Sequence, residues 1–365
     1  MKKQTMLISQ QKITPKWSDL FQIFKNNYNK CQNKDILKKY LSKQHFYWTG
    51  SGREALRQIL LNLNIKKVGV PAFTCYVVPE TVKIAHKEVI YYDSGVIVEF
   101  EEIKKIIDKV DAIIISYNFG FIPEIDKIAT LCKKKNVILI EDCAQALGAR
   151  YKEKLVGGYG DYAFYSFGIS KNIGFCGGMI SSNRKIRIKS NNIFPKKKLI
   201  KVLIEILIAP LFFNKHVYPF SRKILSKELN KKQESLAYQC PKIAIKVIIQ
   251  QFKRYNKILK VRQENAKKCL NKLKESQINF IKPLNNSNPA WLYFCILTDN
   301  RDLVTHKLLK EGVELGKMKT FQCFDENCKK SLQTEKETLT FALYRPKKEI
   351  KIITKKIIKV ENEER

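Results

Sequence analysis

The chain has 365 residues, of which 44% are hydrophobic and 11% aromatic, so it is long enough for a large core and too apolar for a disordered protein. Its formal charge of +35 comes from 69 basic and 34 acidic residues. Ten cysteines without CxxC spacing and four scattered histidines argue against a disulfide scaffold and a zinc site.

The excess of positive charge has two interpretations. Drift of the composition towards lysine is favoured, because 58 of the basic residues are lysine and arginine is preferred for bidentate phosphate recognition. No nucleic-acid-binding motif occurs, so we expect no nucleic-acid partner, and an anionic membrane surface is the alternative. The N-terminus lacks the apolar segment of a signal peptide, and the most hydrophobic run, 199–213, is too short to span a bilayer. We therefore expect a cytoplasmic protein with reduced thiols.

Residues 1–45 are predicted to form an irregular start and one or two helices, because the apolar residues of 15–30 have helical spacing: Trp17, Leu20, Phe21 and Phe24. Small residues at 49–52 then precede a helix-forming run that begins near Arg53. A glycine turn that opens a helix presents N–H groups to an anion, although an ordinary capped helix gives the same pattern.

Short apolar strands then alternate with helices as far as residue 142. Helices fill the gaps between four predicted strands, at 68–73, 89–92, 112–120 and 137–142. Continuous apolar strands that alternate with helices indicate a parallel sheet covered on both faces. Functional groups of such sheets lie at the carboxyl ends of the strands, where the sequence places Asn118 and Asp142.

The pattern changes after Ser182. A basic loop leads into the hydrophobic helix 199–213, which we interpret as buried in a domain or dimer interface, with docking on an anionic membrane as the alternative. The stretch 216–241 is ambiguous. The remaining predicted elements are a long amphipathic helix over 243–275, a strand at 291–297, and helices at 301–312 and 348–360.

These elements divide the chain into three parts. The first is the N-terminal segment 1–45, and the second is a large domain over 46–250, in which 183–245 diverges and includes the hydrophobic helix. The third, 251–365, holds the greater part of the long linking helix and a small C-terminal domain of strands and helices.

Three separated segments carry the candidate chemistry: SGREAL (51–56), IEDCAQALGA (140–149) and GDYAFYSFGISKNIGFCGGMI (160–180). Together they resemble the DegT/StrS-type (DegT/DnrJ-like) sugar aminotransferases, which are pyridoxal-phosphate enzymes of fold type I. The resemblance implies an α/β fold, with a mostly parallel seven-stranded sheet between helices in the large domain and a small C-terminal α+β domain. It also implies a homodimer with the site at the interface.

The resemblance assigns a role to each residue of these motifs. Lys171 would form the Schiff base with pyridoxal phosphate and move the proton between substrate and cofactor carbons. Asp142 would pair with the pyridine nitrogen, and Gln145 would reach the ring hydroxyl or the ring face. The phosphate would be held by Gly52, Arg53 and Ser166. Each residue also has an ordinary alternative: a solvated lysine, a capping aspartate, a polar glutamine on a helix, a serine bonded to backbone, or an arginine pointing to solvent.

Two positions and one segment depart from the family pattern. Cys75 stands where an aromatic residue often stacks on the cofactor ring, so either Tyr76 supplies the stack or the ring is covered differently. Tyr117 replaces a histidine that many members carry, and AYQCPKIA (237–244) stands where members have an Asn-Tyr-Arg-Met-like segment that reaches the neighbouring subunit. Lys171 itself argues against the dehydrating branch, which replaces the lysine with histidine.

The resemblance implies an aminotransferase that passes an amino group, with L-glutamate as the expected donor, to a keto-sugar nucleotide in surface polysaccharide or glycan biosynthesis. Two alternatives stay open. One is a cofactor-binding or regulatory protein that does not transaminate, and the other is a membrane-surface-associated variant that acts on a different keto substrate.

Overall fold

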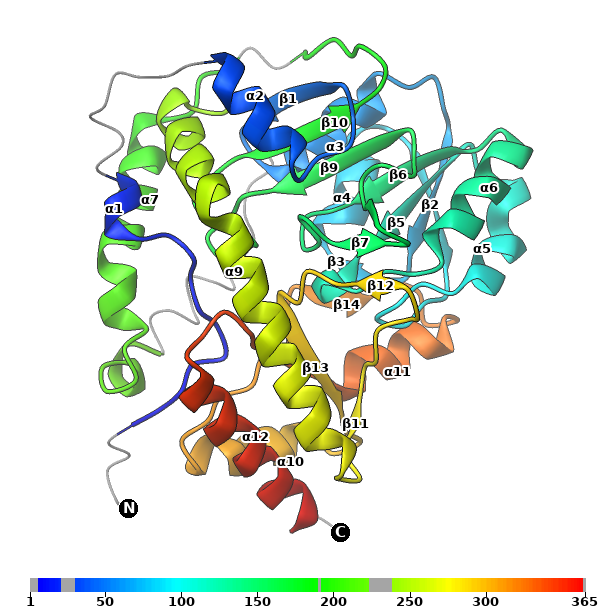
Figure 1. Ribbon diagram of the computed structural model, residues 1–365. Coiled ribbons are helices and arrows are strands. Elements are labelled where there is room, and N and C mark those ends of the chain that lie inside the picture. Colours follow the sequence, from blue (N-terminus) through cyan, green and yellow to red (C-terminus); the bar gives the residue numbers. More distant parts are fainter. Residues whose placement is uncertain (1–5, 21–29, 190–191, 223–237, 364–365) are drawn as a thin grey trace.

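A seven-stranded sheet forms the centre of the large domain in the computed structural model, which describes residues 6–20, 30–189, 192–222 and 238–363 (Figure 1). The strand order is β1-β10-β9-β6-β5-β2-β4, and β10 runs antiparallel to both of its neighbours while the other four pairings are parallel. The bounds are β1 His45–Thr49, β2 Lys67–Pro71, β4 Glu88–Tyr92, β5 Ala112–Ser116, β6 Ile138–Asp142, β9 Tyr162–Ser166 and β10 Gly178–Ser182. The predicted mostly parallel, seven-stranded architecture is confirmed.

Helices cover both faces of the sheet, which explains why its central strands are apolar at nearly every position. Ile114 and Ile140 pack on one face against α3 (Gly52–Leu61) and α4 (Val77–Ile84). Ile113, Ile115 and Leu139 pack on the other face, against a second set of helices: α5 (Phe100–Ile106), α6 (Ile125–Lys135) and α9 (Lys242–Lys274). Successive residues of a central strand therefore pack into the hydrophobic cores on opposite faces of the sheet.

Two strand predictions differ from the structure. The predicted strand at 112–120 ends at Ser116, and Asn118 begins a short 3-10 turn, Asn118–Gly120, in which Phe119 has a φ of 59°. Asn118 is therefore not at a strand end, and its side chain donates instead to the Phe73 carbonyl at 3.2 Å. The predicted strand at 68–73 is interrupted at Ala72, after which β3 (Phe73–Cys75) pairs with β14 (Phe321–Cys323). Strands β1, β9 and β10 were not predicted individually.

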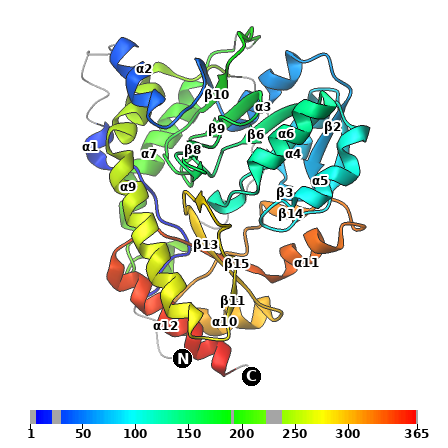
Figure 2. The ribbon, with the colours of Figure 1, turned by 45° about the vertical axis from the view of Figure 1, so that its right-hand side comes forward.

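The C-terminal part forms a smaller sheet, which the long helix α9 joins to the large domain (Figures 1 and 2). This sheet is antiparallel, in the order β11-β13-β15, with bounds Asn279–Phe280, Tyr293–Leu297 and Thr338–Ala342. The helices of this part are α10 (Arg301–Lys310), α11 (Lys329–Glu337) and α12 (Lys347–Asn362). The N-terminal segment reaches it too, since Ile8 bridges to Val313 and the Ala342 N–H donates to the Gln10 carbonyl.

The hydrophobic helix predicted at 199–213 is α7 (Lys196–Phe212), which lies beside the short helix α1 (Trp17–Leu20) at the left edge in Figure 1. The described chain buries only one side of α7, so the predicted burial in a domain or dimer interface stays a prediction for the outer side. Among the described residues, no helix has the length and apolarity needed to cross a membrane. Phe21, Phe24 and most of the ambiguous stretch 216–241 lie outside the described residues.

The remaining helical segments are α2 (Lys30–Lys38), at the N-terminal side, and the 3-10 turn Ile107–Lys109, which follows α5. The short strands β7 (Arg150–Tyr151), β8 (Lys154–Leu155) and β12 (Ser287–Asn288) form a small sheet of their own. This sheet links a large-domain loop to the segment that follows α9.

Candidate active site

The predicted site residues come from segments that meet at the carboxyl ends of the central strands. Asp142 is the last residue of β6 and pairs in register with Ser116, the last residue of β5. Ser166 is the last residue of β9, which lies on the other side of β6. The parallel topology thus delivers an acid and two hydroxyls to one edge of the sheet.

Gly52 and Ser166 are packed directly against each other. A Cβ atom on Gly52 would lie 2.7 Å from the Ser166 Cβ and 3.1 Å from its Oγ, so only glycine fits here without displacement. Gly52 is the first residue of α3, and the Ser51 side chain caps this helix by accepting from the Glu54 N–H at 3.1 Å. Because the first N–H groups of a helix have no intrahelical acceptor, the start of α3 and the Ser166 hydroxyl together form an anion cradle.

The Asp142 carboxyl group is half-buried and weakly solvated. Burial raises the pKa of Asp142 from 3.8 to about 6, while the Ala144 N–H, the nearby Lys171 and the Ser116 hydroxyl act in the opposite direction. The Ala144 N–H donates to Oδ1 at 2.9 Å. Ser116 lies 3.4 Å from the Thr74 hydroxyl, so a short chain of hydroxyl groups orients the carboxylate. The sequence did not identify Thr74 or Ser116, because their strands are distant from β6 along the chain.

The segment that carries Lys171 is clamped from α9 and β13. The Lys171 N–H donates to the Gly168 carbonyl at 2.9 Å, and the Tyr293 hydroxyl contacts the Ser170 carbonyl at 3.4 Å. In the amide orientation that satisfies its neighbours, Asn172 donates to the Gln145 carbonyl and accepts from Tyr255 and Arg262. The residues on both sides of Lys171 are therefore fixed, while its own side chain is half-buried.

Arg262 is a fully buried cation that contacts Asn172, the residue that follows Lys171. Its guanidinium group lies 3.4 Å from the Asn172 carbonyl and 5.9 Å from the centre of the Tyr344 ring, and within the described residues no carboxylate forms an ion pair with it. Burial lowers the pKa of Arg262. The sequence contains a sign that Arg262 is buried. Inward-facing positions of α9 alternate in spacing between four and three residues, and Arg262 occupies one of them: 248, 252, 255, 259, 262, 266, 269 and 273.

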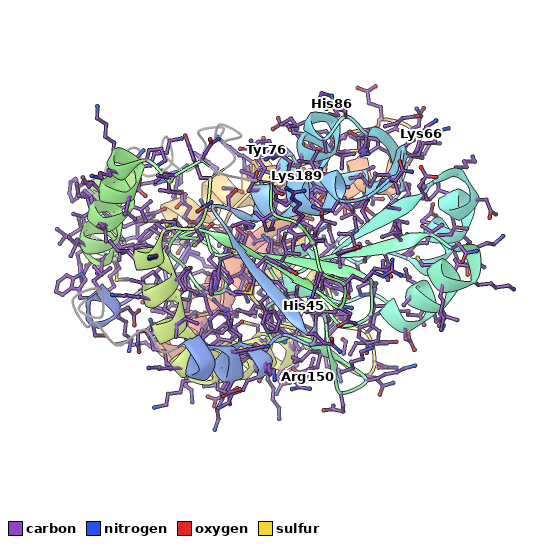
Figure 3. All side chains as sticks on the ribbon, turned by 90° about the horizontal axis from the view of Figure 1, so that it is seen from above. His45, Lys66, Tyr76, His86, Arg150 and Lys189 are labelled. Carbon is purple, nitrogen blue, oxygen red and sulfur yellow. The ribbon has the colours of Figure 1, made fainter. Side chains whose placement is uncertain are left out.

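Cys75 and Tyr76 occupy different surroundings. Burial raises the pKa of the Cys75 thiol, and the charges of Lys171, Asp142 and Arg53 all act on it, so Cys75 lies within the cluster of site residues. The Tyr76 ring lies under the Arg53 guanidinium group at 5.7 Å, towards one edge of the molecule in the view from above (Figure 3). Arg53 also lies 3.8 Å from the Glu80 carboxylate. Cys75 therefore shares its environment with both Lys171 and Asp142, and Tyr76 contacts Arg53.

Gln145 is buried beside the site, and its amide oxygen accepts from the Phe119 N–H at 2.6 Å. This bond fixes the turn that follows β5, and the Phe119 ring packs edge-on against Tyr293 of the smaller sheet at 6.2 Å. The Gln145 oxygen is thus committed to the backbone, and its amide N–H groups are the atoms that remain to face a ligand.

Glu141 and Tyr117 lie on the opposite face of the sheet from Asp142. Glu141 is fully buried and accepts four hydrogen bonds at 2.5–2.8 Å, from the Tyr117 hydroxyl and from the N–H groups of Gly157, Tyr159 and Gly160. Tyr117, at the position where many family members carry histidine, therefore points away from the site. These two residues fasten the turn that precedes β9.

The described part of the segment AYQCPKIA contacts its own chain. The Tyr238 carbonyl accepts from the Gly50 N–H at 2.7 Å, and the Gln239 N–H donates to the Asn192 carbonyl at 3.0 Å. This segment thereby supports the turn before α3.

Residues 27–201 match the DegT/DnrJ/EryC1/StrS aminotransferase family, which confirms the predicted resemblance. The chain is 33% identical over 172 residues to the GDP-perosamine synthase of Escherichia coli O157:H7, covering 44% of this chain and 46% of that protein. It is 29% identical over 153 residues to a protein named pleiotropic regulatory protein from Geobacillus stearothermophilus, covering 40% and 41%. The chain thus matches less than half the length of these relatives.

Solved structures resemble the chain over nearly its whole length. A Streptococcus pneumoniae protein described as a sugar aminotransferase, in its PLP form, superposes with a TM-score of 0.75 at 16% identity, covering 98% of this chain and 99% of that one. The Helicobacter pylori aminotransferase PseC, involved in the biosynthesis of pseudoaminic acid, superposes with a TM-score of 0.74 at 14% identity, covering 98% and 100%. At these identities the likeness establishes the fold, which is that of the aminotransferases of fold type I.

Proposed function

We propose, from the membership of residues 27–201 in the DegT/DnrJ/EryC1/StrS aminotransferase family, that the chain is a pyridoxal-phosphate-dependent aminotransferase that acts on a keto-sugar nucleotide. The observation that carries the proposal is the grouping of Lys171, the Asp142 carboxylate and the Gly52–Ser166 cradle at one edge of the sheet. The names of sequence relatives, among them GDP-perosamine synthase, support the substrate class.

The residues present fit pyridoxal phosphate. Because position 52 carries no Cβ, the Ser166 hydroxyl packs against the start of α3, where it can bind a phosphate group together with the free N–H groups of the helix. Asp142, with its pKa of about 6, lacks a cationic partner in direct contact within the described residues, and a protonated ring nitrogen would supply one. Cys75 has an environment shared with Lys171 and Asp142, which makes it the residue expected against the ring.

Each of these side chains then has a defined task. Bound pyridoxal phosphate supplies an electron sink for the substrate carbon that bears the amine. Lys171 Nζ would hold the cofactor, and its amine would hold and return the proton of that carbon. Asp142 would keep a proton on the ring nitrogen, and Gly52 with Ser166 would anchor the phosphate. Arg53, placed between Tyr76 and Glu80, supports the start of α3 and adds positive charge near the phosphate.

The donor, the assembly and the location belong to the same proposal. L-Glutamate is the proposed amino donor, and a cytoplasmic homodimer is the proposed form of the protein. A non-transaminating regulatory protein is the second candidate, favoured by Cys75 at the ring position and by the name of the Geobacillus stearothermophilus relative.

Absorbance spectroscopy of the protein loaded with pyridoxal phosphate tests the proposal. A visible band should move to shorter wavelength when L-glutamate is added, and one member of a panel of keto-sugar nucleotides should restore it. The band should disappear in Lys171→Ala and persist in Lys133→Ala, which changes an exposed lysine on α6. A stable band that no amino donor moves would favour the regulatory candidate. An unchanged band in Lys171→Ala would refute the assignment of the lysine.

A further inference from the structure

Helix α7 is apolar on two sides, although the described chain covers only one of them. Ile206 and Ala209 face inward and are buried. Five large side chains face outward and are 39–58% exposed: Ile200, Ile204, Leu207, Ile208 and Leu211. Their spacing of i, i+4, i+7, i+8 and i+11 places them on one continuous face of the helix. Single exposed leucines are ordinary on a protein surface, but a contiguous stripe of five marks an interaction surface.

Trp17 extends this outer face. Its indole Nε1–H donates to the Leu207 carbonyl at 3.1 Å, and its side chain is 56% exposed. Helices α1 and α7 lie together at the left edge of the molecule in Figure 1. Tryptophan has an apolar ring system and one polar N–H, and this combination is enriched at membrane–water interfaces.

Lysines are concentrated at the N-terminal end of α7. Lys196, Lys197 and Lys198 fill its first turn, with Lys201 in the next turn, and all four are exposed. The helix has no acidic residue in its first turn and no side-chain cap. Cations at the positive end of a helix dipole are unfavourable, so this placement suits a helix whose N-terminal end meets an external anionic surface.

A second copy of the chain is a poor partner for this face. Glu205 is the sole acidic residue of α7, and it already lies 3.7 Å from Lys201. Antiparallel pairing of two copies would bring the lysine turn of one helix to the end of the other, where Lys215 and His216 follow. Parallel pairing would oppose the two lysine turns directly. Either arrangement leaves positive charges together.

We propose that the outer face of α7, with Trp17, docks on an anionic lipid membrane. The helix lies in the plane of the interface, with its apolar stripe in the headgroup–acyl boundary and its lysines among the lipid phosphates. This mode of attachment agrees with a helix too short and too charged to cross the bilayer. The inference is independent of the proposed enzymatic activity, because none of the residues that form this face belongs to the candidate active site.

Flotation with lipid vesicles tests the inference on the full-length protein. Vesicles of phosphatidylcholine with about one third phosphatidylglycerol should carry the protein at moderate salt, whereas pure phosphatidylcholine should not, and high salt should weaken binding because it screens surface charge. Replacing Lys196, Lys197 and Lys198 by glutamine should lower the affinity on the order of 100-fold, about fivefold for each lysine.

The apolar stripe has its own variant and matched control. Ile204→Glu with Leu207→Glu should abolish flotation, whereas Leu303→Glu should not, since Leu303 is similarly exposed, at 44%, but lies on α10. Far-ultraviolet circular dichroism and sedimentation velocity of each variant show whether fold and assembly are kept. Failure of the parent protein to float, or equal flotation on the neutral vesicles, would overturn the proposal. A loss of dimer in the stripe variant without vesicle binding by the parent would assign the face to a second copy instead.

Discussion

Two adjacent carboxylates, Glu141 and Asp142, should respond to neutralisation in opposite directions. They end the same strand but face opposite sides of the sheet. Glu141 is surrounded by four hydrogen-bond donors, whereas Asp142 has one N–H and one hydroxyl group in an environment that disfavours its charge. The perturbations are Glu141→Gln and Asp142→Asn, which preserve shape and remove one negative charge each.

The magnitudes follow from these contacts. Each oxygen of Glu141 accepts two hydrogen bonds, so an amide nitrogen in either place would face two donors. The loss of two charge-assisted bonds at about 1.5–3 kcal/mol each gives a destabilisation of about 3–6 kcal/mol. The pKa of Asp142 is raised from 3.8 to about 6, which corresponds to a cost of up to about 3 kcal/mol for its ionisation in the folded protein. Discounted for partial exposure, Asp142→Asn should stabilise the cofactor-free protein by about 1–2 kcal/mol at pH 8.

The sign of the pH dependence provides a second test. A carboxyl group with a raised pKa in the folded state destabilises the protein fully above the folded value, near 6, and not at all well below the unfolded value, near 4. The advantage of Asp142→Asn should therefore shrink by about half at pH 5. Urea denaturation of the cofactor-free proteins, followed by circular dichroism at pH 5 and pH 8, measures these differences. Equal effects of the two substitutions, or a destabilising Asp142→Asn, would refute the assignment of separate roles.

Three further predictions concern the site. In Gly52→Ala the new Cβ would lie 2.7 Å from the Ser166 Cβ, so Ser166 must move by at least ~0.7 Å to reach an ordinary contact of about 3.4 Å. The affinity for pyridoxal phosphate should therefore fall about tenfold or more. Adding Ser166→Gly should recover thermal stability but not affinity, as a cofactor titration would show. Arg262→Met should leave the free energy of unfolding unchanged or higher, because a buried cation that forms no ion pair within the described residues adds little stability. The same substitution should lower kcat about tenfold at similar KM, because Arg262 positions Asn172 beside Lys171. Cofactor affinity should fall as pH drops through about 6, more steeply in the parent than in Asp142→Asn, because the Asp142 carboxylate becomes protonated.

The central strands could be predicted because their apolar runs are unusually clear. Ala112–Ser116 and Ile138–Asp142 are buried on both faces, which leaves a continuous hydrophobic signal in the sequence. Strand β1, His45–Thr49, lies at a sheet edge and is mostly half-buried, so its residues give no such signal. Asp142 was placed correctly at a strand end because a carboxylate closes an apolar run.

The side chains that contact these residues could not be predicted from the sequence, because they come from segments that are distant along the chain. Ser116 and Thr74 orient Asp142 from other strands, and Arg262 approaches Asn172 from a helix 90 residues away. The burial predicted for 199–213, in a domain or dimer interface, is provided by the described chain on one side of the helix only. Apolar composition shows that a helix needs apolar surroundings, but it does not tell whether the same chain provides them on both sides.

The most direct measurement of the central claim is the identity of the lysine that holds the cofactor. Borohydride reduction of the protein loaded with pyridoxal phosphate, followed by proteolysis and mass spectrometry, locates the modified residue among 58 lysines. Our account predicts stoichiometric labelling of Lys171 that falls when Asp142 is replaced by asparagine. Labelling spread over surface lysines, or confined to a lysine other than Lys171, would contradict it.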